Sequence, residues 1–182
     1  MSTVENAEDS VGSVLPDTRD FGTIANDLCE KALQDAKSQL HPLFQNAELN
    51  RLDQRREFLQ AFRSALEERI ARKLALWQPA VQAVFRFDEA PMENAETWDG
   101  SIHLLLKVER LSNAVQVLGK KLDQSLTRCL KQKSWSRFHK RKSMLEIQQV
   151  TPNEMRHGIS YGAMFFAVYT VPVKIWPLDR RG

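Results

Sequence analysis

The sequence has few of the residues and none of the motifs that build catalytic or metal sites. Its 182 residues include two cysteines and four histidines, and the histidines have no spacing typical of metal ligands. The motifs G-x-S-x-G, G-x-x-x-x-G-K-[ST], G-x-G-x-x-G, C-x-x-C and H-E-x-x-H are all absent. The sequence therefore predicts a protein that is not an enzyme and that needs no cofactor and no metal.

Signals for export and for membrane insertion are also missing. No apolar run approaches the ~18–20 residues of a membrane helix, and the opening residues MSTVENAEDSVG lack the basic and apolar regions of a signal peptide. Cys29 and Cys129 each fall at an apolar position of an expected helix, which favours two buried thiols over a disulfide. We expect a soluble protein, or part of an assembly built inside a cell, without membrane contact.

Charges of opposite sign are concentrated in different parts of the chain, although the net charge is only +3. Residues 1–17 contain acids and no lysine or arginine, which predicts an acidic flexible arm. Residues 128–142 contain no acid, and Trp135 and Phe138 lie among the basic residues. This pattern favours a solvated loop, a surface for an acidic protein such as the arm of a second copy, or a nucleic-acid contact. The predicted surface for an anionic partner consists of Arg128, Lys131, Lys133, Arg137, Lys140, Arg141 and Lys142.

Apolar spacing divides residues 18–182, the expected single domain, into helices and strands. Spacings of three and four residues predict helices over 18–41, 50–77 and 111–131, with Ser112 as a cap of the third. Alternation predicts strands in AVQAVFRFDEA, SIHLLLKVE and MLEIQQV, followed by a turn at TPNE. The first strand would place Val81, Ala83, Phe85 and Phe87 on one side, and it would pair with the second as an antiparallel hairpin.

The longest alternation lies near the C-terminus, over residues 159–176. Every odd position from Ile159 to Ile175 is apolar or aromatic, which predicts a core strand that closes the sheet. Strands usually have ~3–10 residues. This length favours either a central strand over 160–170 with an irregular tail after Pro172, or a segment partly completed by a neighbouring subunit. We predict a subunit interface at its end, formed by Tyr169, Val171, Val173, Ile175 and Trp176.

The predicted order is helix, helix, strand, strand, helix, strand, strand. It indicates an α+β fold in which helices cover one face of an antiparallel or mixed four-stranded sheet. The adjacent Glu67 and Glu68 could form a paired-carboxylate site. However, Arg69 and Arg72 on the same helix favour a solvated charged face at this position.

The second half of the chain also carries a resemblance to a known family. A strand SIHLLLKVE leads into the helix LSNAVQVLGKKLDQSLTRCL, and then come MLEIQQV, a T-x-N-E-type turn, the step GISYG and a strand ending in FAVYTVPV. This order resembles the tail-terminator or tail-completion proteins of tailed bacteriophages, over about residues 50–175. The family has no catalytic signature to carry over to this chain.

The resemblance implies a structural virion protein that forms a hexameric ring at the top of the tail tube. Its partners would be further copies of itself, the tail tube or sheath and the neck proteins, with non-specific proximity to DNA. Its location would be the virion, after assembly in the host cytoplasm. Two alternatives stay open: a small basic nucleic-acid-binding protein that uses residues 128–142, and a host adaptor or chaperone whose sheet face binds a partner.

Overall fold

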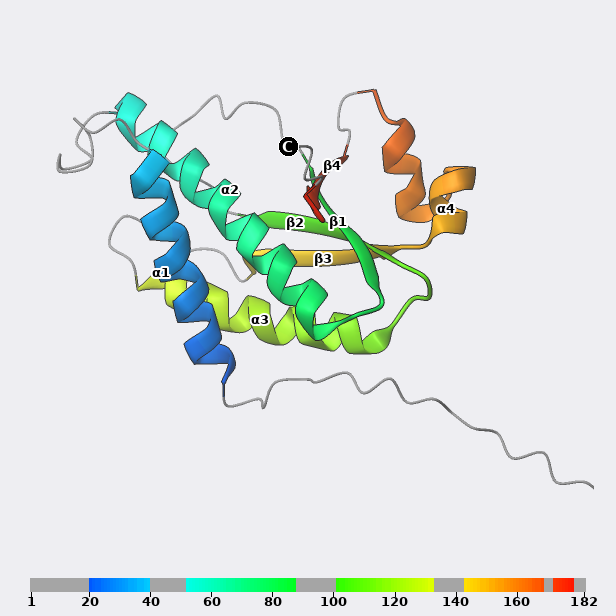
Figure 1. Cartoon of the computed structure of the whole chain (residues 1–182), viewed down its shortest axis with the longest axis horizontal. Coiled ribbons are helices and arrows are strands. Elements are labelled where there is room, and N and C mark those ends of the chain that lie inside the picture. The colour runs from blue at the N-terminus through cyan, green and yellow to red at the C-terminus, as the bar shows by residue number, and fades with distance from the viewer. Residues whose placement is uncertain (1–19, 40–51, 88–100, 133–142, 169–171, 179–182) are drawn as a thin grey trace, which may run out of the picture.

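A computed structural model describes the parts of the chain that hold all the predicted elements (Figure 1). The described residues are 20–39, 52–87, 101–132, 143–168 and 172–178. The helices are α1 (Phe21–Gln39), α2 (Leu52–Trp77), α3 (Asn113–Lys131), the short α4 (Pro152–His157) and the 3-10 helix η3 (Ser160–Phe166). The strands are β1 (Val81–Phe87), β2 (Ile102–Val108), β3 (Leu145–Val150) and β4 (Pro172–Trp176). The predicted acidic arm lies outside the described residues.

The four strands form one mixed sheet in the order β3-β2-β1-β4. Strand β1 is antiparallel to both β2 and β4, whereas β2 and β3 are parallel and are joined by α3. Two consecutive parallel strands need a crossover connection of this kind, because a tight turn can join only antiparallel strands. The predicted α+β class with a four-stranded mixed sheet is therefore confirmed.

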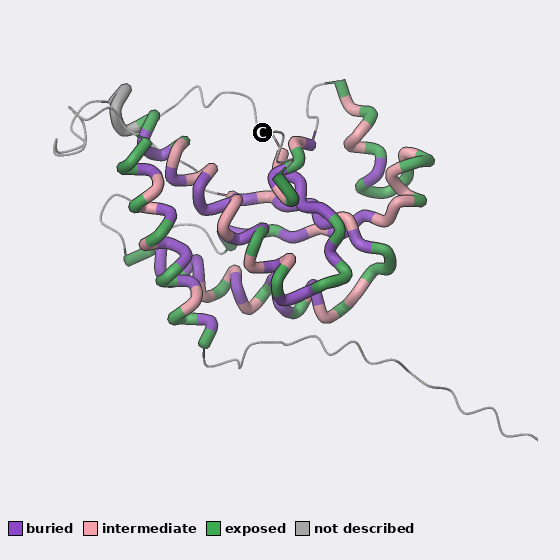
Figure 2. The backbone as a smooth tube through the Cα atoms, in the orientation of Figure 1, coloured by how far each residue is buried: buried purple, intermediate pink, exposed green. Residues whose placement is uncertain are grey.

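The main core lies between the sheet and the three long helices, which Figure 1 shows together on one side. Helix α2 supplies an apolar stripe with the predicted four-residue spacing, and strand β2 supplies its alternate residues. These residues are all buried: Phe58, Phe62, Leu66, Ile70 and Leu74 from α2, and Ile102, Leu104, Leu106 and Val108 from β2. Figure 2 shows the buried positions on the inner sides of these elements.

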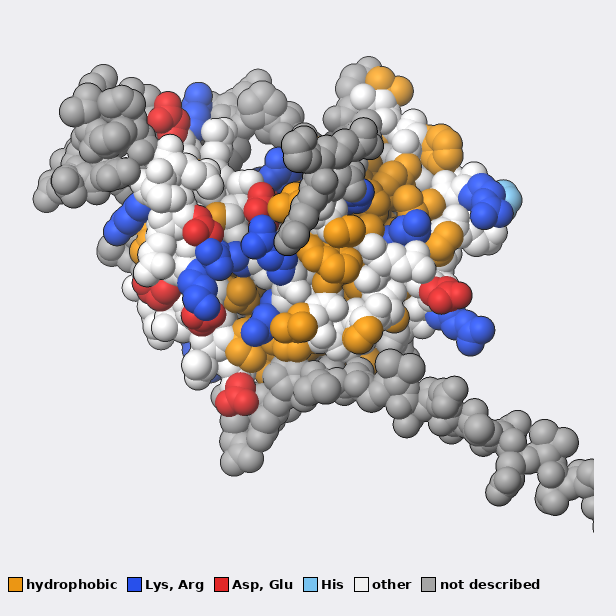
Figure 3. All heavy atoms as spheres, in the orientation of Figure 1, with side chains coloured by type: hydrophobic (Ala, Val, Ile, Leu, Met, Phe, Trp, Pro, Cys, Tyr) orange, Lys and Arg blue, Asp and Glu red, His pale blue; other side chains and the backbone are white. Residues whose placement is uncertain are grey.

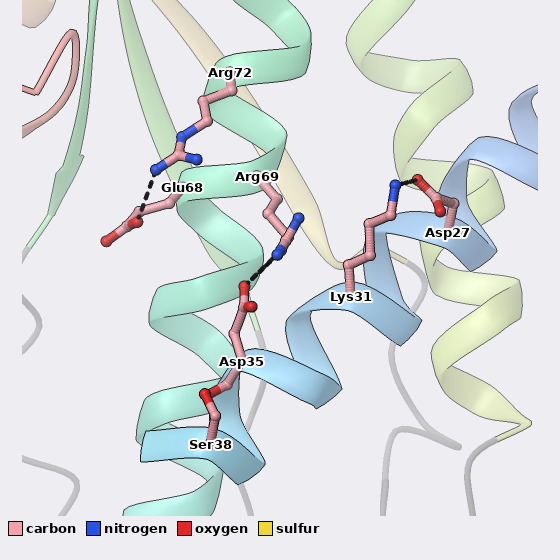
Figure 4. Close-up of polar contacts among 7 residues, drawn as sticks. All are labelled: Asp27, Lys31, Asp35, Ser38, Glu68, Arg69 and Arg72. Carbon is pink, nitrogen blue, oxygen red and sulfur yellow. Dashed lines mark hydrogen bonds and ion pairs between the residues drawn. The ribbon is translucent and has the colours of Figure 1, made fainter.

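An ion pair supports the packing of α1 on α2. Arg69 of α2 reaches Asp35 of α1 at 2.6 Å, and Figure 4 shows this bridge beside the pairs within each helix. The predicted buried thiols are confirmed, because Cys29 and Cys129 are both buried and reduced. The Sγ atom of Cys129 lies 3.7 Å from Oδ1 of Asn26, so it also contacts α1.

A second, smaller core lies on the opposite face of the sheet. It consists of Ala83, Phe85, Leu105 and Val150, and Met155 of α4 and Phe165 of η3 pack against it. The rings of Phe85 and Phe165 meet edge to face, with centroids 5.0 Å apart. Short helices therefore cover part of the second face of the sheet, for which the sequence predicted no helices.

Strand β1 contains an irregularity, and its first residue therefore lies on the opposite face of the sheet from the one predicted. The pairing register with β2 shifts between Val81 and Ala83. A bulge of this kind inserts one residue and moves the following side chains to the other face. Val81 therefore packs in the main core with Val84, while Ala83 and Phe85 belong to the second core. The expectation that Val81 shares a face with Ala83, Phe85 and Phe87 is wrong.

The long strand predicted over residues 159–176 is also wrong. Among the described residues of this segment, only Pro172–Trp176 forms a strand, and Ser160–Phe166 forms η3 instead. Gly158 adopts a left-handed φ of 61° and ends α4, so the chain turns back on the helix. A Cβ atom on Gly162 would overlap the carbonyl oxygen of Glu154, which shows how closely η3 lies against α4. As a result, Ile159 and Tyr161 are exposed rather than buried.

Candidate functional site

The predicted subunit interface lies on and just before the edge strand β4. Tyr169 and Val171 fall outside the described residues. Val173 and Trp176 are half-buried and lie opposite Arg86 and Val84 of β1. Ile175 is 5% exposed and belongs to the main core, so its side chain already packs within its own subunit. The interface stays a prediction, and on β4 it depends on Val173 and Trp176.

Two residues of the predicted anionic-partner surface can be placed. Arg128 and Lys131 are exposed in the last turn of α3. Basic side chains there interact favourably with the negative end of the helix dipole, which gives them a stabilising role in addition to any partner. The other members lie outside the described residues: Lys133, Arg137, Lys140, Arg141 and Lys142.

Glu67 and Glu68 do not share the solvated face that the sequence favours. Glu68 is partly exposed and lies 3.6 Å from Arg72. In contrast, the side chain of Glu67 is only 3% exposed and contacts Arg63 at 2.8 Å and Arg86 of β1 at 3.6 Å. Arg63 lies one turn earlier on α2, so Glu67 joins the helix to the sheet through Arg86 alone. The expectation of a solvated Glu67 is therefore wrong.

The open side of the sheet carries a further polar pair but no metal-ligand set. His103 of β2 lies opposite Glu146 of β3, with Nδ1 and Oε2 3.2 Å apart. Among the described residues, no three His, Cys, Asp or Glu side chains come together as metal ligands. None of the described helices is long and apolar enough to cross a membrane.

Local hydrogen bonds hold the unit formed by α4 and η3 together. Thr151 caps α4: Glu154 N–H donates to Thr151 Oγ1 at 3.3 Å, while Thr151 N–H donates to Glu154 Oε2 at 2.7 Å. Such a capping box satisfies two backbone donors at once. At the other end, Ile159 N–H donates to the carbonyl of Glu154 at 3.2 Å and joins η3 to the helix.

This unit presents three large apolar side chains to solvent, which we call the η3 apolar surface. They are Ile159, Phe166 and Val168, with exposed fractions of 51%, 66% and 84%. The Phe166 ring lies over Gly158, with its nearest atoms 3.2 Å from where a Cβ would stand. Figure 3 shows apolar side chains gathered over this part of the molecule. Sequence reasoning assigned these residues to a strand and missed the surface.

A pocket of about 310 Å³ lies beside this unit, between the start of α3, the end of β3 and η3. We call it the α3–η3 pocket. Its lining residues come from three separate parts of the sequence: Leu111, Ser112, Asn113, Gln116, Gln148, Gln149, Glu154, Ser160 and Tyr161. Because no short motif links these parts, the sequence carries no signal that could have found the pocket.

Comparison with known proteins identified no relative of this chain. No protein-family model, no curated protein and no solved structure matches the chain. The class that the structure defines is an α+β domain with three long helices on one face of a mixed sheet and the α4–η3 unit on the other.

Proposed function

We propose that this protein is a structural subunit that forms an oligomeric ring at the neck end of a phage tail tube, as a tail terminator. The observation that carries the proposal is the η3 apolar surface on the α4–η3 unit. Val168 and Phe166 expose more than half of their side-chain surface to water. Apolar side chains grouped in this way mark interaction sites on soluble proteins.

The order of elements supports the same proposal. From α2 onward the chain runs α2, β1, β2, α3, β3, α4, η3 and β4. Apart from α4 and η3, this is the order on which the resemblance to tail terminators depends. One part of that resemblance is weakened, because GISYG and the residues after it form η3 where a closing strand was expected.

The edges of the sheet offer a second contact for neighbouring copies. Among the described residues, β4 pairs with β1 alone and β3 pairs with β2 alone. A ring subunit needs two different, complementary lateral surfaces, since head-to-tail contacts must close. The η3 apolar surface and the β4 edge can supply such a pair. The ring would contact the tail tube or sheath and the neck proteins, with DNA passing without sequence readout.

The oligomeric state tests the assembly part of the proposal. Light scattering and negative-stain electron microscopy of the full chain should give a closed ring with several times the 21.0 kDa subunit mass. The double variant Phe166→Lys, Val168→Lys should dissociate to monomers, because two charges would be desolvated at the contact. Leu76→Lys is the matched control, since Leu76 is 72% exposed on α2, far from η3 in sequence. A monomeric wild type, or a double variant that keeps the ring, would contradict the proposal.

Immunogold labelling of tailed particles tests the location separately. The label should appear at the end of the tail nearest the head. Labelling at another site, or none, would contradict the tail-terminator role even if the purified protein forms a ring.

A further inference from the structure

The α3–η3 pocket lies where β–α–β units commonly bind ligands. Strands β2 and β3 are parallel, so their carboxyl ends meet at one edge of the sheet, and α3 begins at that edge. Ligands of open sheets with parallel strands bind at this end. The volume of about 310 Å³ is at the lower limit of small-molecule sites, which indicates room for one ring-sized group.

Two of the lining side chains hold the walls of the pocket in place. The Gln149 carboxamide pairs with the backbone of Ser112: Ser112 N–H donates to Oε1 at 3.0 Å, and Nε2 donates to the Ser112 carbonyl at 2.9 Å. The Glu154 carboxylate accepts from the backbone and the hydroxyl of Thr151 at 2.7 and 2.9 Å. The first contact fixes the start of α3 against β3, and the second caps the start of α4.

Other lining side chains keep their hydrogen-bonding capacity. Asn113 and Gln116 of α3 and Tyr161 of η3 make no side-chain hydrogen bond to another described residue. Two carboxamides and a phenol offer donors and acceptors side by side. The pocket therefore offers neutral hydrogen-bonding groups beside walls that are joined by hydrogen bonds.

The charges around the pocket favour a neutral ligand. No lysine or arginine is among its described lining residues, and Glu154 is the one charged side chain there. The start of α3 carries the positive end of the helix dipole, and its first turn contains no acidic residue. Glu154 faces the same pocket and offsets this partial charge. A phosphate would therefore meet a carboxylate and no cation.

The rim of the pocket is apolar on two sides. Leu111 is 61% exposed and Tyr161 is 38% exposed, and both line the pocket. Sites that take an unstacked nucleobase place it between apolar or aromatic side chains and read its edge with hydrogen bonds. A carboxamide matches the donor and acceptor on the edge of adenine. We propose that the α3–η3 pocket binds an adenine base, stacked at Tyr161 and Leu111 and read by Asn113 and Gln116.

Calorimetric titration of the full chain with adenosine tests the proposal. Adenosine should bind in the millimolar range or tighter, and more tightly than cytidine or uridine. Its affinity should change little with salt, because no phosphate contact is involved. Tyr161→Ala should weaken binding about tenfold, whereas Tyr161→Phe should keep the affinity within about threefold because the stacking ring stays. Gln116→Ala should also cost about tenfold.

Gln124→Ala is the matched control, because Gln124 is exposed on the same helix and does not line the pocket. It should bind adenosine like the wild type. Titration with a short oligodeoxyadenylate shows whether the adenine comes from a nucleic-acid strand or from a free nucleoside. Much tighter binding than that of adenosine indicates a single strand, and a similar affinity indicates a free nucleoside. The same chain should show no heat with glucose.

Three outcomes would overturn the proposal: no binding of any nucleoside at millimolar concentration, binding that Tyr161→Ala leaves unchanged, or preferential binding of glucose. Unfolding temperatures of the variants, measured alongside, identify any loss caused by misfolding, and if Tyr161→Ala misfolds, an unchanged affinity in folded Gln116→Ala overturns the proposal instead. The residues differ from those of the η3 apolar surface, so failure of this proposal leaves the ring proposal untouched.

Discussion

Single polar side chains connect the helices to the sheet in ways that periodicity does not reveal. Oδ1 of Asp123, in the middle of α3, accepts hydrogen bonds from the backbone N–H groups of Met144 and Leu145 at 2.7 and 2.8 Å. The Thr127 hydroxyl donates to the same oxygen at 3.2 Å. One carboxylate therefore positions the start of β3. In the sequence, Asp123 resembles any polar residue on the outer face of a helix.

Replacing Asp123 with alanine should lower the free energy of unfolding by about 2–3 kcal/mol, because two backbone donors lose a charged acceptor. Asp123→Asn should cost less, since an amide oxygen can still accept. Urea unfolding measures the difference, with Gln124→Ala as the control at the next, exposed position. If Asp123→Ala unfolds at the same urea concentration as Gln124→Ala, these hydrogen bonds do not support β3.

Glu67 should matter far more than its neighbour Glu68. Glu67→Gln leaves Arg63 and Arg86, with side chains only 16% and 28% exposed, facing a neutral group. Breaking a buried ion pair in this way costs up to about 3–5 kcal/mol, and partial exposure of the arginines should reduce this to about 2 kcal/mol. Glu68→Gln should stay within about 0.5 kcal/mol, because its pair with Arg72 is solvent-exposed. Equal unfolding midpoints for the two variants would contradict the anchoring role.

Elements with strong periodicity were predictable, and the failure over residues 159–176 has a local cause. The four-residue stripe of α2 and the alternation in β2 each bury one face, so spacing alone identifies them. The alternation from Ile159 to Ile175 serves three environments instead: solvent at Ile159, the second core at Phe165 and the main core at Ile175. Local backbone signals decided the outcome, and they were present in the sequence.

Those signals are the cap and the glycines around α4. Thr151, Pro152 and Glu154 form a capping box with proline at the helix start, and Gly158 takes the left-handed C-cap position. Together they specify a short helix where TPNE was expected to be only a turn. This explains why a strand could not begin near Ile159.

Gly162 should be needed for the α4–η3 unit. In Gly162→Ala the added methyl group would overlap the Glu154 carbonyl, so η3 must move off α4. We expect a loss of about 2 kcal/mol or more, with faster amide hydrogen exchange over residues 152–166 and unchanged exchange in α2.

Gly22→Ala is the control for this variant, because a Cβ at Gly22 in the first turn of α1 meets nothing within 4 Å. It should stabilise the protein by about 0.5–1 kcal/mol, since alanine loses less conformational entropy in a helix than glycine. Unchanged exchange over 152–166 in Gly162→Ala would contradict the close packing of η3 on α4.

At the scale of the whole molecule, the sheet order joins residues that are far apart in the chain. Strand β4 lies beside β1, so Trp176 pairs with Val84. The sequence predicted four strands and their fold class, but pairing depends on three-dimensional packing that spacing does not encode. The α3–η3 pocket was unpredictable for the same reason, because the crossover through α3 brings its walls together only in the folded chain.

Removal of β4 should therefore destabilise the whole domain. A chain ending at Val171 lacks Ile175, which is buried in the main core, and Trp176, which packs against it. Loss of large core side chains costs about 2–5 kcal/mol each, a large part of the 5–15 kcal/mol that typically separates folded from unfolded domains. Circular dichroism should show a much lower unfolding temperature, and light scattering should show aggregation through the exposed edge of β1.

A chain ending at Leu178 is the control, because it keeps the whole of β4, and it should melt like the full chain. Equal unfolding temperatures for the two truncated chains would show that β4 adds nothing to the core. This result also determines how subunit contacts can be tested. Because truncation at Val171 removes core contacts and edge contacts together, a loss of oligomers in that chain would not identify an interface. Point variants at Phe166 and Val168 leave Ile175 in place, so they separate assembly from folding.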